Sequence, residues 1–149
     1  MRVAIDPGAG TLVATASLVV APPGPLSFFL NGEFEIDGVD VDGATSPVTK
    51  GEPDDHLAFS PGSRRFSVPA PPAPGETMRL VVRYHGAPGG GPRSISRITP
   101  DLTELNLYAA WFPVIEGPQG FDYEIEVEAP QAQRLVTAGA APPDGVARG

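Results

Sequence analysis

The sequence predicts an all-β fold, an antiparallel β-sandwich of about eight to ten short strands. Apolar and polar residues alternate with a period of two in several short runs, which is typical of strands with one face in water. Glycine (18 residues) and proline (19 residues) punctuate these runs, and no stretch carries a long amphipathic helical pattern. We therefore expect residues 1–149 to form one β-sandwich domain.

The clearest pattern lies between Glu104 and Pro130, which we interpret as a strand, a turn and a second strand. In the second half, apolar residues alternate strictly with acidic ones. The apolar set is Phe121, Tyr123, Ile125, Val127 and Ala129, and the acidic set is Asp122, Glu124, Glu126 and Glu128. The first half ends at the only tryptophan, Trp111, whose predicted face is otherwise aliphatic, so we assign it to the core.

Other alternating runs predict further short strands. We assign strands to residues 11–20, 26–30, 34–36, 39–41, 57–59, 65–68, 78–85 and 135–138. Asn31-Gly32 is a type I′ hairpin signal and predicts that the strands on either side of it pair with each other. Asp37-Gly38 is expected to end the strand that begins at residue 34.

Three segments are predicted to contain no strand. Residues 44–56 form a polar loop after a turn at Asp42-Gly43, and residues 86–94 form a flexible loop of glycine and proline. The tail, residues 140–149, carries turn signals without an element to pack after them. We expect it to be truncated or disordered, the chain being a piece of a longer protein cut near Gly149.

Charge and composition exclude several classes of function. The formal net charge of −8 argues against a nucleic-acid partner, because phosphate binding needs clustered Lys and Arg. The absence of cysteine excludes disulfides and thiolate metal sites. The chain shows neither a signal-peptide pattern nor a run near the ~18 apolar residues of a membrane span. We expect a soluble chain without direct membrane insertion; its compartment is not fixed, with the cytoplasm favoured.

The histidines do not form a recognisable metal site. A catalytic zinc ion needs three protein ligands, and neither His56 nor His85 stands in a His-Glu-x-x-His pattern. His56 follows Asp54 and Asp55, which could make a weak cation site, but a solvated loop histidine is the better interpretation. His85 ends a strand and is interpreted as an exposed neighbour of Arg83.

Other catalytic patterns are also absent. No serine lies in a Gly-x-Ser-x-Gly context, and the glycines of 86–92 lack the Gly-Lys-Ser/Thr ending of a phosphate loop. Asp37, Asp40 and Asp42 are spaced like part of a calcium loop, but the Glu at its twelfth position is missing. We therefore predict no catalytic residue, no metal ligand and no cofactor in this chain.

Two aromatic residues predict a contact with another domain. Tyr108 and Phe112 lie on the face of their predicted strand that should be wet, so a buried interdomain interface explains them best. Stacking of Tyr108 and Trp111 against a sugar or a peptide is the alternative, and the core assignment of Trp111 weighs against it.

At these residues the chain resembles the N-terminal β-domain of zinc aminopeptidases of the aminopeptidase-N type, the gluzincins, including their relatives fused to membrane transport proteins. The similarity runs over nearly the whole chain. It is carried by residues 9–20, by 26–43 with its Val-x-Val-Asp-Gly turn, by 83–86 (Arg-Tyr-His-Gly), by Trp111-Phe112-Pro113 with Glu116-Gly117-Pro118, and by Ala138-Gly139.

The resemblance implies a saddle-like sandwich that packs against a thermolysin-like catalytic domain. In the family that second domain carries the zinc helix, His-Glu-x-x-His, and a Gly-x-Met-x-Asn loop for the amino end of the substrate, and this chain contains neither motif. The implied function is a non-catalytic N-terminal accessory domain that docks the catalytic domain of the same polypeptide and shapes the substrate cleft. Zinc is expected in the catalytic domain only.

One family residue of the β-domain reaches the substrate, 14 positions before the Pro of the Asp-x-Pro segment. Counting back from Pro118 gives Glu104, which is therefore the implied substrate-binding residue for the amino end of a peptide. The sequence departs from the family at Glu116, which replaces the Asp, and lacks the Arg after the Phe. The alternatives are a free-standing Ig-like protein- or carbohydrate-binding module and a family member whose downstream domain has lost its zinc ligands.

Overall fold

The computed structural model describes residues 1–21, 25–53, 62–69, 77–89, 96–106, 109–115 and 124–130, and the backbone of 146–148. These residues contain thirteen strands and no α-helix, which confirms the all-β prediction. The strands are β1 (Arg2–Asp6), β2 (Thr11–Val20), β3 (Ser27–Asn31), β4 (Glu35–Val41), β5 (Ala44–Ser46), β6 (Thr49–Pro53), β7 (Ser63–Ser67), β8 (Met78–Gly86), β9 (Arg97–Ile98), β10 (Thr103–Glu104), β11 (Val114–Ile115), β12 (Glu124–Glu128) and β13 (Val146–Arg148). None of the described residues forms a helix long and apolar enough to cross a membrane.

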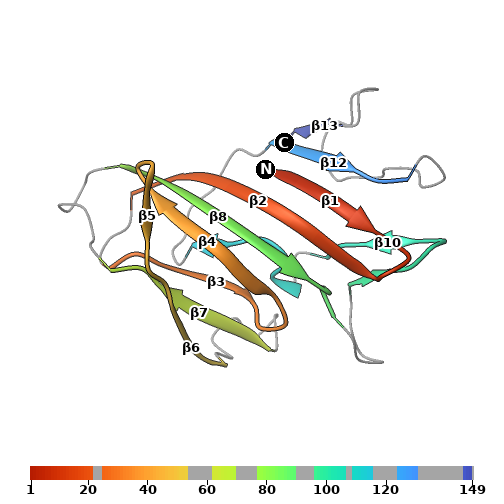
Figure 1. Cartoon of the computed structure of the whole chain (residues 1–149), viewed down its shortest axis with the longest axis horizontal. Coiled ribbons are helices and arrows are strands. Elements are labelled where there is room, and N and C mark those ends of the chain that lie inside the picture. The colour runs from red at the N-terminus through yellow and green to blue at the C-terminus, as the bar shows by residue number, and fades with distance from the viewer. Residues whose placement is uncertain are drawn as a thin grey trace.

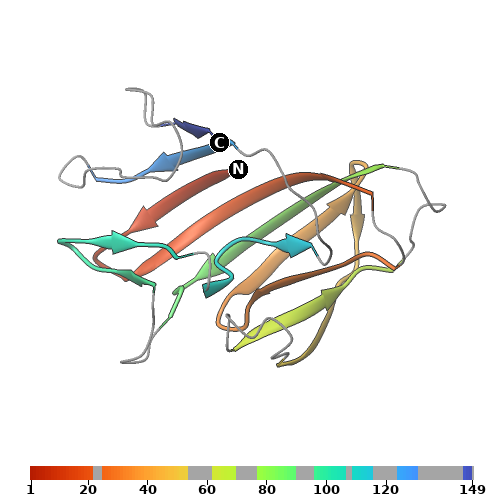
Figure 2. The same cartoon turned by 180° about the vertical axis from the view of Figure 1, so that it is seen from behind.

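Two sheets face each other in a sandwich-like arrangement (Figures 1 and 2). The larger sheet has the order β13-β12-β1-β2-β8-β4-β5, and the smaller one has the order β11-β3-β7-β6. β9 and β10 form a separate two-stranded hairpin. The pairs are antiparallel except β1 with β12, where Arg2 lies opposite Glu126 in a parallel register. The predicted antiparallel β-sandwich is thus confirmed, and β1 with β12 is its one parallel pair among the described residues.

The core follows from alternation in the two longest strands, β2 and β8. β2 buries Leu12, Ala14, Ala16 and Val20, and β8 buries Met78, Leu80, Val82 and Tyr84. The smaller sheet contributes the rings of Phe28 and Phe66, which stack with centroids 5.4 Å apart. Trp111 is 8% exposed and belongs to the same core, so its predicted core assignment is confirmed.

The predicted hairpin at Asn31-Gly32 is wrong, because β3 and β4 lie in different sheets. A turn does form there, closed by the Phe34 N–H donating to the Asn31 carbonyl oxygen at 3.1 Å. Gly32 has no positive φ; it is required because a Cβ would lie 2.6 Å from the carbonyl oxygen of Gly62. The signal therefore marks a crossing between the sheets, where two backbones approach closely.

The strand after this turn also differs from its prediction. β4 continues through Asp37-Gly38, and a β-bulge between Ile36 and Gly38 shifts its register with β8 at this point. The turn at Asp42-Gly43 is confirmed: both residues have positive φ, 49° and 85°, and they join β4 to β5 as a two-residue hairpin. The predicted loop 44–56 instead contains β5 and β6.

Within the stretch from Glu104 to Pro130, the described residues 104–106, 109–115 and 124–130 contain less strand than predicted. Between β10 and β11 the chain turns at residues 109–110, where Ala110 has a φ of 46°, so the described residues 105–106 and 109–111 do not belong to a strand. The second half agrees better with the predicted strand, since the acidic residues of β12 are exposed and Ile125 and Val127 are half-buried. The predicted strands at 57–59 and 135–138 lie outside the described residues.

The two ends of the described chain meet in the larger sheet. β1 was not predicted, and it occupies the position between β2 and β12. Residues 146–148, in the tail where we expected no packed element, form β13 antiparallel to β12. Local alternation over three to five residues is too short to identify either strand, because their partners lie far away in the sequence.

Candidate functional site

Glu104, the implied substrate-binding residue, ends β10 of the β9–β10 hairpin. In the register of the hairpin Glu104 lies opposite Arg97, and the Arg97 Nε is 3.6 Å from the Glu104 Oε2. The two side chains are 60% and 52% exposed, so this ion pair is solvated and contributes little to stability. The carboxylate is therefore accessible to a ligand, and Arg97 is the cation with which an incoming ammonium group would compete.

The turn of the hairpin is held by the side chain and backbone of one threonine. The Thr99 hydroxyl donates to the Leu102 carbonyl oxygen at 2.8 Å and accepts from the Leu102 N–H at 3.0 Å, while the Thr99 N–H donates to the same carbonyl at 2.9 Å. Leu102 is 44% exposed at this tip. Figures 1 and 2 both place the hairpin beside the turn between β1 and β2.

The chain that follows the hairpin is anchored to the sandwich at several points. The buried Ser96 hydroxyl oxygen accepts from the Asn106 N–H at 2.8 Å, which ties the two flanks of the hairpin together. The Asn31 side-chain amide donates to the Ala109 carbonyl oxygen at 3.0 Å, and the Asn31 N–H donates to that of Ala110 at 2.9 Å. These bonds hold Asn106 beside Ser96 and hold Ala109 and Ala110 beside the end of β3.

The next anchor is a buried tyrosine. The Tyr84 hydroxyl donates to the Trp111 carbonyl oxygen at 2.8 Å, and burial raises the pKa of this hydroxyl well above its usual range. The hydrogen bond provides the partner that a buried phenol requires. Trp111 is thereby fixed through its backbone as well as through its ring.

Phe112 and Tyr108 were predicted to contact another domain. The Phe112 ring packs edge-on against Trp111, with centroids 5.2 Å apart and planes at 81°, and it is half-buried against the core. Phe112 was expected on the wet face of a strand, but its ring contacts the core, because the chain turns at Ala110. Tyr108 lies outside the described residues, and the interface itself stays a prediction.

A second group of charged residues lies on the outer face of β4 and β8, and sequence reasoning did not connect its members. The Arg83 guanidinium donates to both carboxylate oxygens of Asp40, at 2.6 and 3.1 Å. These hydrogen bonds lower the pKa of the Asp40 carboxyl and raise that of Arg83. A Cβ on Gly38 would lie 2.7 Å from an Arg83 nitrogen, so the glycine of the bulge leaves room for this pair.

His85 belongs to the same face. Its Nδ1 lies 2.9 and 3.1 Å from the two carboxylate oxygens of Asp37, and its Nε2 lies 3.8 Å from the Glu35 carboxylate. The hydrogen bond to Asp37 raises the pKa of the His85 imidazole, with a further contribution from the Asp37 charge. His85 is exposed as predicted, but its partners are these two carboxylates rather than Arg83. The sequence of either strand alone does not indicate which residues of β4 and β8 become neighbours in the sheet.

The described residues do not fit a zinc site. They contain no group of three or more His, Asp or Glu side chains that could hold a metal ion. His85, Asp37 and Glu35 do not converge on one point, because the two carboxylates lie at opposite nitrogens of the ring. His56, with Asp54 and Asp55, lies outside the described residues. We derive no chemical step through a metal in this chain.

These features define a β-sandwich with a projecting hairpin and no assembled catalytic group in the described part. No protein-family model and no curated protein matches the chain. Solved structures do match. A leukotriene A4 hydrolase from Saccharomyces cerevisiae is similar over 99% of this chain, at 11% identity and a TM-score of 0.61. An M1 zinc metallopeptidase from Deinococcus radiodurans, in a variant bound to a Tyr-Ser-Ala substrate, matches over 99%, at 17% identity and a TM-score of 0.60.

The similarity is one of fold. The chain spans 25% of the length of the yeast hydrolase and 36% of that of the Deinococcus metallopeptidase. The chain therefore has the fold of one part of such zinc metallopeptidases, as the sequence motifs indicated. The alternative of a free-standing Ig-like module gains no support from these similarities.

Proposed function

We propose that this chain is a non-catalytic accessory domain of a zinc-aminopeptidase-like protein. The observation that carries the proposal is the match of almost the whole chain, 99%, to a quarter to a third of larger zinc metallopeptidases. A domain of this kind leaves the chemistry to a second domain and supplies one wall of the substrate cleft. The catalytic domain of the same polypeptide is then its principal partner.

Glu104 is the residue that we assign to the substrate. Its carboxylate is half-exposed, it stands on a hairpin braced by hydrogen bonds, and its present partner is a solvated arginine. The free amino end of a peptide is an ammonium group, for which a carboxylate is a strong hydrogen-bond acceptor. The ammonium group would take the place of Arg97 as the ion-pair partner of Glu104.

Phe112 and Tyr108 are proposed to lie at the interface with the catalytic domain, together with the exposed tip residue Leu102. Phe112 is held by Trp111 and offers a half-buried ring, and Leu102 offers an aliphatic side chain that is 44% exposed. Burial of such side chains contributes about 25 cal/mol per Å² of apolar surface, so a modest contact is sufficient to dock the hairpin.

The first experiment extends the reading frame of the source gene past the codon for Gly149. A His-Glu-x-x-His motif downstream supports the proposal, and its absence points to a binding or scaffolding descendant of the fold. In parallel, the purified chain is assayed on aminoacyl substrates with and without zinc. We expect no turnover, and robust hydrolysis by the pure chain would contradict the non-catalytic assignment.

The role of Glu104 is tested in the protein that contains both domains. Glu104→Ala is expected to raise KM for peptides with a free amino end about tenfold, the cost of one charge-assisted hydrogen bond. Peptides blocked at the amino end lack the ammonium group and should bind equally weakly to both proteins. Asp101→Asn removes a carboxylate from the same hairpin and serves as the matched control. An unchanged KM in Glu104→Ala would remove Glu104 from the substrate site.

A further inference from the structure

The pair Asn31-Gly32, at the end of β3, is chemically the most reactive dipeptide of its kind in the chain. The sequence contains two asparagines, Asn31 and Asn106, and only Asn31 is followed by glycine. The side-chain Cγ of an asparagine can be attacked by the backbone nitrogen of the next residue, which closes a five-membered succinimide ring and releases ammonia. Glycine presents this nitrogen with the least hindrance, because it has no Cβ. Asn31 therefore has the higher intrinsic tendency to deamidate.

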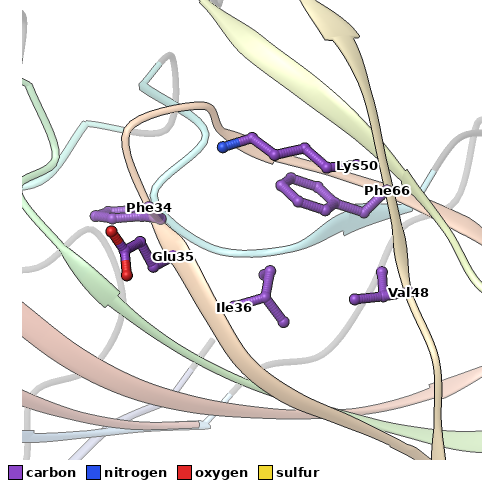
Figure 3. Close-up of a pocket in the computed structure, with 6 residues that line it drawn as sticks. All are labelled: Phe34, Glu35, Ile36, Val48, Lys50 and Phe66. Atoms are coloured by element: carbon purple, nitrogen blue, oxygen red, sulfur yellow. The ribbon is translucent and has the colours of Figure 1, made fainter.

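The attacking nitrogen, that of Gly32, is restrained by the fold. The Gly32 N–H donates to the Gly62 carbonyl oxygen at 3.0 Å, and a Cβ on Gly32 would lie 2.6 Å from the same oxygen. The Gly32 carbonyl oxygen accepts from the Lys50 Nζ at 3.1 Å, and Figure 3 shows the Lys50 side chain reaching toward the turn that leads to Phe34. The nitrogen must lose its proton to a base in water before it can attack. The close approach that requires glycine here thus also keeps its nitrogen from reacting.

The group under attack, the Asn31 carboxamide, is restrained as well. Its nitrogen donates to the carbonyl oxygens of Pro88 and Ala109 at 2.9 and 3.0 Å, and its oxygen accepts from the Glu33 N–H at 3.0 Å. The side chain is half-buried. Attack turns the planar Cγ into a tetrahedral centre and moves both polar atoms away from these partners. All three hydrogen bonds therefore oppose the reaction.

We propose that Asn31 is a site of spontaneous deamidation that reacts only when the turn after β3 opens. In the open state hydroxide removes the Gly32 amide proton, the nitrogen bonds to the Asn31 Cγ, and the Cγ–Nδ2 bond breaks with release of ammonia. Water then adds to one of the two imide carbonyls and breaks its bond to the ring nitrogen. The products carry aspartate or isoaspartate at position 31, each with a carboxylate in place of the amide.

Neither product can return to the original place of Asn31. Both lack the two N–H donors for Pro88 and Ala109 and direct a carboxylate at these carbonyl oxygens. Isoaspartate also lengthens the backbone by one methylene at the end of β3, where Asn31 is paired with Ser63. Refolding does not reverse the change, because the ammonia has left. Each conversion thus makes an opening of this segment permanent, and the inference does not depend on the peptidase context proposed above.

The test compares the rate of deamidation in the folded and the unfolded chain. The 149-residue chain is kept at mildly alkaline pH with and without guanidinium chloride, and mass spectrometry follows the exchange of amide for carboxyl in the peptide that contains Asn31. Enzymatic methylation of isoaspartate identifies the succinimide route. The rate at Asn31 should be at least about thirtyfold lower in the folded chain. Asn106, which precedes a leucine, is the internal control and should react far more slowly than Asn31 in guanidinium chloride.

A matched pair of variants tests the part played by the Gly62 carbonyl. Gly62 and Gly43 both have a left-handed φ, 87° and 85°, and the space for a Cβ is free at each. Gly62→Ala and Gly43→Ala therefore add a similar backbone strain, but only the first lies in the turn that holds the Gly32 N–H. We expect Gly62→Ala to raise the rate at Asn31 in the folded chain about five- to tenfold. Gly43→Ala should leave this rate unchanged.

The proposal is overturned by any of four results. Equal rates in the folded and unfolded chain would show that the hydrogen bonds do not restrain the reaction. An absence of conversion at Asn31 in guanidinium chloride would remove the site. Equal rates in the two glycine variants would show that the Gly62 carbonyl does not hold the nitrogen, and aspartate without isoaspartate would exclude the succinimide.

Discussion

Asn31 joins three separate parts of the chain, and its replacement by alanine is the most direct test of how the hairpin segment is held. Its side-chain amide donates to the carbonyl oxygens of Pro88 and Ala109, at 2.9 and 3.0 Å, and its side-chain oxygen accepts from the Glu33 N–H at 3.0 Å. Asn31→Ala removes all three hydrogen bonds and leaves the backbone of β3 unchanged.

The expected cost follows from these bonds. A net contribution of about 0.5–1.5 kcal/mol each, with the bond to Glu33 at the low end because it is exposed, gives a loss of about 2–3 kcal/mol in the free energy of unfolding. For a domain of this size the thermal midpoint should fall by roughly 5–10 °C. Asn31→Asp keeps the acceptor for Glu33 but points a carboxylate at two carbonyl oxygens. Its loss should be at least as large above pH ~4, where the carboxyl is ionised.

Urea unfolding followed by the fluorescence of Trp111 measures these losses, since this is the only tryptophan and it is 8% exposed in the folded chain. Val19→Thr is the control, because Val19 is 77% exposed and its replacement should change stability by less than about 0.5 kcal/mol. If both Asn31 variants unfold at the same urea concentration as this control, the segment is not held by Asn31 and the reasoning fails.

Three further predictions concern packing and charge. Leu80→Ala, at a fully buried position of β8, should cost about 2–5 kcal/mol in the same urea experiment, and a loss below 1 kcal/mol would contradict the core assignment. The pKa of His85, measured by NMR titration, should exceed ~6.5 and fall back toward that value in Asp37→Asn. Because the pKa of His85 is raised in the folded chain, its pairing with Asp37 stabilises the fold fully below pH ~6.5. This stabilisation is lost as the pH rises through the folded pKa. A gain in the free energy of unfolding over the same pH range would contradict the prediction. Gly38→Ala should lower the thermal midpoint by displacing Arg83, and the effect should largely vanish in an Arg83→Ala background, as a double-mutant cycle would show.

The parts of the fold that could be predicted from sequence are those determined by short-range pattern. The alternation in 11–20 and 78–85 identified β2 and β8 and their buried faces. This pattern arises in any strand that has one face in water, so it does not depend on which strands are its partners. The turn at Asp42-Gly43 was also local, because its two positive φ angles suit those residue types. Fold class therefore followed directly from residue order.

The missed features depend on partners distant in the sequence. Asn31-Gly32 has the composition of a hairpin turn, but its neighbours Gly62 and Ala109 determine that the chain crosses between sheets there. The candidate site likewise has one feature that could be predicted from the sequence and others that could not. The position of Glu104 came from motif spacing, whereas its pairing with Arg97 and the pairing of His85 with Asp37 required the three-dimensional arrangement.

The parallel pairing of β1 with β12 has a consequence for the order of folding. The Met1 ammonium group donates to the Glu124 carbonyl oxygen at 2.6 Å across a sequence separation of 123 residues, and the Glu126 N–H donates to the Met1 carbonyl at 2.8 Å. Contacts of this span must close nearly the whole chain into a loop, which makes them slow to form. During synthesis the first strand thus pairs early with β2 but keeps one bare edge until β12 has been made. A ribosome-bound or arrested chain would expose that edge to other strands, so aggregation during synthesis is expected to begin there.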